Sequence, residues 1–77
     1  MTDFKGYATM IRNGAEQRDT ATTKQAAWDA LRAITRNDLP AAAAAARRTA
    51  DAAQEVDIRQ DANNLAAAIE AAIEAAR

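Results

Sequence analysis

Residues 39–50 read LPAAAAAARRTA, and this alanine-rich stretch decides the fold class. Alanine has the highest helix propensity of all residues, and proline is tolerated in the first turn of a helix. The chain of 77 residues contains 24 alanines, two glycines and one proline. None of its segments alternates apolar and polar residues with the period of two that a strand requires. The sequence therefore predicts an all-α protein, a small antiparallel three- or four-helix bundle that forms one domain over residues 1–77.

Helix start and stop signals divide the chain into four predicted helices, over about residues 3–13, 22–36, 40–54 and 58–76. Residues that commonly cap helices precede several of these segments, and Gly14 is typical of a helix end. The expected caps are Thr2, Thr22 and Asp57, with Gln25 completing a capping box after Thr22. The turn at Asn37–Pro40 is short, so we expect the second and third helices to pack as an antiparallel hairpin.

Apolar residues spaced by three and four indicate which helix faces are buried. In the first helix these residues are Phe4, Tyr7, Ala8, Ile11 and Ala15. In the second helix we expect a buried face made of Ala27, Trp28, Leu31, Ile34 and Thr35. Gln25, Asp29, Arg32 and Arg36 fall on the opposite, solvent-facing side of the second helix.

The last predicted helix carries a heptad-like apolar seam. Its members are Ile58, Ala62, Leu65, Ile69, Ala72 and Ala76, with Ile73 flanking the seam. We expect this seam to pack within the chain, against the second helix. The alternative is a homodimer that forms through Leu65, Ile69 and Ile73.

Composition excludes several classes of chemistry. The chain has no cysteine and no histidine, which removes disulfides, thiolate nucleophiles and the commonest metal ligand and general base. Glu70 and Glu74 are better explained as a solvated helix face than as an acid–base pair, and we expect no enzyme activity, cofactor or metal. The N-terminal residues lack the pattern of a signal peptide and the longest apolar run is too short to span a bilayer, so we expect a cytoplasmic protein.

Charge is distributed unevenly, although the net charge is only -1. Residues 24–48 carry a net charge of +3 and residues 49–76 a net charge of -5. Four arginines flank the predicted hairpin turn, and a tryptophan precedes them on the second helix. Tryptophan and arginine are the residues most enriched at interface hot spots. The predicted partner-binding surface therefore consists of Trp28, Arg32, Arg36, Arg47 and Arg48.

A second interpretation of Trp28 stays open at this point. It is the largest side chain in a sequence with few large ones, so it is equally suited to the core. In that case Arg32 would cover the edge of the ring through a cation–π contact.

These features together predict a non-enzymatic protein that acts by binding another macromolecule. We expect a protein-binding inhibitor or regulator. In size and composition only, the chain resembles small proteins of phages and mobile elements, anti-CRISPR proteins among them. One alternative is a nucleic-acid-binding regulator that uses the arginine patch. The other alternative is a self-assembling structural or scaffold protein.

Overall fold

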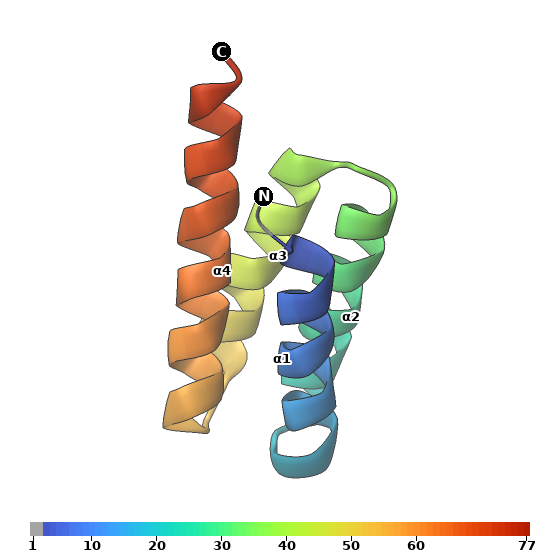
Figure 1. Ribbon diagram of the computed structural model, residues 1–77. Helices are drawn as coiled ribbons and strands as arrows, with labels where there is room; N and C mark the ends of the chain where they lie inside the picture. The colour runs from blue at the N-terminus through green and yellow to red at the C-terminus, as the bar shows by residue number, and fades with distance from the viewer. Residues whose placement is uncertain (1–2) are drawn as a thin grey trace.

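The computed structural model describes residues 3–77, which form an antiparallel bundle of four helices without a strand (Figure 1). The helices are α1 (Phe4–Arg18), α2 (Ala21–Thr35), α3 (Leu39–Ala52) and α4 (Val56–Ala75). They form a ring in which α1 packs on α2 and α4, and α3 packs on the same two helices. The last turns of α4 rise past the ends of the other helices in Figure 1. The predicted all-α fold class is confirmed.

Side-chain caps fix the beginnings of the first three helices. Asp3 accepts a hydrogen bond from the Gly6 N–H, and Asp38 accepts one from the Ala41 N–H. Thr20 caps α2 by accepting from the Thr23 N–H, so the predicted capping box at Thr22 is wrong. The extended backbone of Thr20, with ψ of 164°, lets its hydroxyl face the first turn of α2.

Of the two other predicted caps, Asp57 is wrong and Thr2 is not tested. Asp57 lies in the first turn of α4 and does not cap it, because Glu55 occupies the cap position. The predicted cap Thr2 lies outside the described residues. Apart from the first helix, the predicted helix limits agree with the structure to within two residues.

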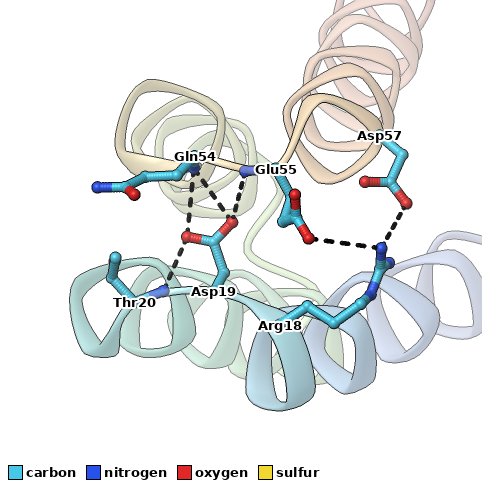
Figure 2. A network of polar contacts seen from close by, with 6 residues as sticks. All are labelled: Arg18, Asp19, Thr20, Gln54, Glu55 and Asp57. Carbon is cyan, nitrogen blue, oxygen red and sulfur yellow. Dashed lines mark hydrogen bonds and ion pairs between the residues drawn. The ribbon is translucent and has the colours of Figure 1, made fainter.

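Helix α1 does not end at Gly14, as the sequence led us to expect, but continues to Arg18. Ala15 is fully buried, so the extra turn completes a packed face against the bundle. Arg18 then holds this turn to α4, because its guanidinium lies 2.9 Å from the Asp57 carboxylate (Figure 2). The burial of Ala15, together with this contact, offsets the roughly 1 kcal/mol of helix propensity that a glycine loses.

Asp19 joins the two loops at the lower end of the bundle in Figure 1. Its own N–H closes α1 on the Ala15 carbonyl, and its carboxylate accepts from the Thr20 N–H at 2.8 Å. The same carboxylate accepts from the backbone N–H groups of Gln54 and Glu55, at 3.1 and 3.0 Å (Figure 2). One side chain therefore satisfies backbone donors in both the α1–α2 and the α3–α4 connections.

The core is built mainly from alanine. Among the described residues, 14 of the 18 buried apolar side chains are alanines, and Ile11, Ile58, Leu65 and Ile69 are the others. The predicted buried face of α1 is confirmed, with Phe4 and Tyr7 packed at its edge. The packing of α3 also depends on alanine, since four alanines of the run at residues 41–46 are buried.

Helix α2 is rotated relative to the expected buried face. Its fully buried residues are small, namely Thr23, Ala26, Ala27, Ala30 and Ala33. Leu31 and Ile34 lie half-buried at the margins, whereas Trp28 and Thr35 are exposed. The neighbouring helices offer alanine surfaces, and small residues on α2 allow the closest approach to them. The larger side chains then fill the edges of each interface.

The seam of α4 packs inside the chain, as predicted, but against α3 and α1 and not against α2. Leu65 and Ile69 are 3% and 0% exposed, so they offer no surface to a second copy. Ile73 is half-buried and Ala76 is exposed, because α4 there extends beyond the bundle. The alternative of a homodimer through Leu65, Ile69 and Ile73 would require α4 to leave this packing, since Ile73 alone of these three is not fully buried.

Leu65→Ala or Ile69→Ala should lower the free energy of unfolding by about 2–5 kcal/mol, because each creates a cavity in a core with few large side chains. Urea denaturation followed by circular dichroism measures the loss. The melting temperature of the unsubstituted protein should not depend on its concentration. A strong dependence would mean that α4 packs on a second copy.

Asp19→Asn should lower the free energy of unfolding at neutral pH by about 2 kcal/mol, because the charged acceptor of four hydrogen bonds is lost. Burial alone raises the pKa of Asp19, but the hydrogen bonds from Glu55, Thr20 and Gln54 outweigh it and lower the pKa from 3.8 to about 2. The carboxylate therefore stabilises the fold fully above about pH 4, and this stabilisation is lost as the pH falls toward 2.

Denaturation of both proteins at pH 7 and near pH 2 tests this dependence. The difference between Asp19→Asn and the unsubstituted protein should shrink in acid. Asp51→Asn, an exposed position on α3, is the matched control and should show little difference at either pH. An equal difference for Asp19→Asn at both pH values would contradict the assigned role.

Candidate functional site

A shallow groove lies between the second half of α2 and the first part of α3. Its volume is about 450 Å³. Alanines form the floor, and three arginines and one aspartate form the walls. The lining residues are Asp29, Arg32, Ala33, Arg36, Ala41, Ala44, Ala45 and Arg48.

Helical spacing explains why these residues share one surface. Asp29, Arg32 and Arg36 follow one another by three and four residues, which places them along one face of α2. The same spacing brings Ala41, Ala44, Ala45 and Arg48 onto one face of α3. The hairpin turn passes through Asn37, whose φ of 60° lies in the left-handed region that asparagine tolerates. The two faces therefore run antiparallel, side by side.

Asp29 is held between two arginines from different helices. Its Oδ1 accepts hydrogen bonds from Arg32 Nη2 at 2.9 Å and from Gln25 Nε2 at 3.1 Å. Its Oδ2 lies 3.5 Å from Arg48 Nη2 on α3. The hydrogen bonds from Arg32 and Gln25 lower the pKa of Asp29 against the opposing effect of burial, and the charges of Arg32 and Arg48 add to this. Asp29 is therefore ionised at neutral pH.

Arg36 stands at the other end of the groove, next to the turn. Within residues 3–77 its side chain makes no ion pair, whereas Arg32 and Arg48 share Asp29. Three arginines against one aspartate leave the groove with a net charge of +2. This surface is consequently suited to an anionic group and lies on a chain whose overall charge is negative.

Arg47 does not join the other predicted arginines. Its guanidinium turns to α4, where Nη2 and Nε contact the two oxygens of Glu70 at 2.6 and 3.3 Å. Asn63 on the same helix accepts a further hydrogen bond from it at 3.2 Å. Neighbouring residues on a helix diverge by about 100°, which explains why Arg48 faces α2 and Arg47 faces α4. The structure thus brings together Arg32, Arg36 and Arg48 only.

Trp28 lies at the surface, with 38% of it exposed. The guanidinium of Arg12, on α1, is 4.5 Å from the centre of its ring. The predicted cation–π contact with Arg32 is therefore wrong, because Arg12 covers the ring and Arg32 contacts Asp29. Trp28 is not among the residues that line the groove.

Asp29 is the one charged lining residue that was absent from the predicted partner-binding surface. Its spacing of three from Arg32 was a usable signal for an ion pair. The sequence contained no comparable signal for Arg47 and Arg48. Their positions next to each other do not show which of them faces α2 and which faces α4.

Neither a protein-family model, nor a curated protein, nor a solved structure matches the chain. Over the described range, the structure contains no helix with the length and hydropathy needed to cross a membrane.

The fluorescence of Trp28, the only tryptophan of the chain, should report its contact with Arg12. Arg12→Ala uncovers one face of the ring, so quenching by acrylamide should increase and the emission should shift to longer wavelength. Arg32→Ala is the control and should leave both unchanged, since Arg32 is bonded to Asp29. A larger effect from Arg32→Ala would contradict the placement of the ring.

Proposed function

We propose that this protein acts by binding an acidic segment of another protein in the groove between α2 and α3, and thereby inhibits or regulates that protein. The observation that carries the proposal is the convergence of Arg32, Arg36 and Arg48 on one alanine floor, with Asp29 as the only carboxylate among the lining residues. Arginine is well suited to this task, because its planar fork matches a carboxylate and stays charged at every physiological pH.

The floor of the groove supports a protein partner. Ala33, Ala41, Ala44 and Ala45 carry no atoms beyond Cβ, so an incoming chain can approach both helices closely. The apolar floor between charged walls matches the pattern of a protein interface, where a buried apolar centre is surrounded by a polar rim.

Several features disfavour nucleic acid as the partner. The wall of the groove from Asp29 to Arg36, the residue that caps α2, spans only eight residues, a rise of about 10 Å, which is short for a run of phosphate contacts. None of the residues that line the groove is aromatic, so the groove has no platform on which a base would stack.

The arginines of α2 provide the test. Arg32→Glu combined with Arg36→Glu should weaken binding at least about tenfold, since two attractive contacts become repulsive. The probe is a fluorescein-labelled helical peptide with glutamates at i, i+4 spacing, and binding is measured by fluorescence anisotropy. The helical spectrum and the melting temperature should change little, because exposed ion pairs contribute little to stability.

Lys5→Glu combined with Lys24→Glu is the matched control. It changes the net charge by the same amount, lies outside the groove, and places acidic residues in the first turns of α1 and α2, where they are tolerated. This control should retain most of the affinity. Should the arginine pair not fold, Arg32→Gln with Arg36→Gln removes the same charges without introducing repulsion.

Three results would overturn the proposal. One is full affinity in a folded arginine variant, and another is an equal loss in the lysine control. The third is tighter binding of a single-stranded oligonucleotide than of the peptide, with an affinity that falls steeply as salt is added, because phosphate contacts release counterions.

A further inference from the structure

The contact between Asp29 and its two arginines has the form of a bound carboxylate. Arg32 contacts Oδ1 and Arg48 contacts Oδ2, so each oxygen of one carboxylate faces a guanidinium from a different helix. Asp29 reaches this position from the wall of the groove itself. The structure of the free protein thus shows which chemical group the two arginines recognise.

This contact is at the surface and is readily exchanged. The side chains of Asp29, Arg32 and Arg48 are 34%, 60% and 58% exposed. Ion pairs at such exposure hold their partners weakly. If another carboxylate replaces Asp29, both arginines keep an anionic partner. Only the other contacts of Asp29 are lost, including its hydrogen bond with Gln25.

We infer that Arg32 and Arg48 form a carboxylate-binding site which Asp29 fills in the free protein, and that an acidic side chain of the partner displaces Asp29 from it. The inference rests on the proposed function and specifies how the groove recognises its partner. Asp29 then acts as a competitor within the chain, so it lowers the affinity for every anion that would otherwise take its place.

Competition by Asp29 makes the groove selective. A single carboxylate gains little by replacing Asp29, because one ion pair is exchanged for another of the same kind. A partner with two carboxylates also engages Arg36, with which no acidic side chain of residues 3–77 forms an ion pair. Arg32 and Arg36 are separated by a rise of about 6 Å along α2, which two acidic residues one turn apart on a partner helix can match. The groove therefore selects paired acidic residues.

Asp29→Asn tests the inference directly, because it keeps the size of the side chain and removes the competing charge. Its affinity for the glutamate peptide at i, i+4 spacing should rise about three- to tenfold, which corresponds to the release of weak exposed ion pairs. Asp51→Asn is the matched control, since it makes the same change of net charge on an exposed face of α3 outside the groove. Its affinity should change by less than about twofold.

A second substitution separates displacement from a general gain of positive charge. Arg48→Gln, added to Asp29→Asn, removes one of the two groups that hold the carboxylate. It should abolish the gain in affinity, whereas Arg47→Gln added to Asp29→Asn should preserve it, because Arg47 faces α4. Circular dichroism verifies that all four variants are folded.

The possible outcomes distinguish this inference from the proposed function. Equal affinities for Asp29→Asn and Asp51→Asn, or weaker binding by Asp29→Asn, would overturn the inference while binding by the unsubstituted protein upholds the proposed function. Binding by Asp29→Asn alone would support the inference and overturn the function in the unsubstituted chain. The absence of binding by every folded variant would overturn both.

Discussion

Close contact between alanine-faced helices is the constraint on which the rest of the structure depends. An alanine buries little apolar area, so each interface is stabilised by many small contacts and not by a few large side chains. Such contacts require helix surfaces that fit closely along their length. This requirement places small residues at the centre of α2 and α3 and moves Leu31, Ile34 and Leu39 to the margins, where they cover the edges of the interfaces.

Because this core contains few large side chains, contacts in the loops are important for holding the helices in place. The carboxylate of Asp19 accepts hydrogen bonds from backbone donors of two connections (Figure 2). Beside it, Arg18 links the end of α1 to the first turn of α4 through Asp57. Polar contacts of Arg18 and Asp19 thus add to the apolar packing where the α1–α2 and α3–α4 connections meet (Figure 2).

The same alanine surfaces create the candidate binding groove. Where α2 and α3 face solvent, their small residues leave a shallow floor, and long arginine side chains rise on both sides of it. Helix α4 neutralises Arg47 through Glu70, so three of the four arginines that the sequence placed beside the turn remain in the groove. Asp29 offsets part of that charge and presents to Arg32 and Arg48 the chemical group that we propose the partner carries.

The sequence by itself determined the helical class, the approximate helix limits, the buried faces of α1 and α4 and the presence of arginines beside the turn, because local propensity and periodicity encode these features. It did not determine which face of α2 is buried. Apolar residues occur on nearly every face of an alanine-rich helix, so periodicity identifies no unique centre, and the sequence left Trp28 open between the core and the surface. Only the tertiary structure decided that Arg48 faces α2 while Arg47 faces α4, because this choice depends on the rotation of α3 between its two neighbours. It also decided that α1 continues past Gly14: the spacing placed Ala15 on the buried face, but the contact of Arg18 with Asp57 on α4 is one that no local signal contains.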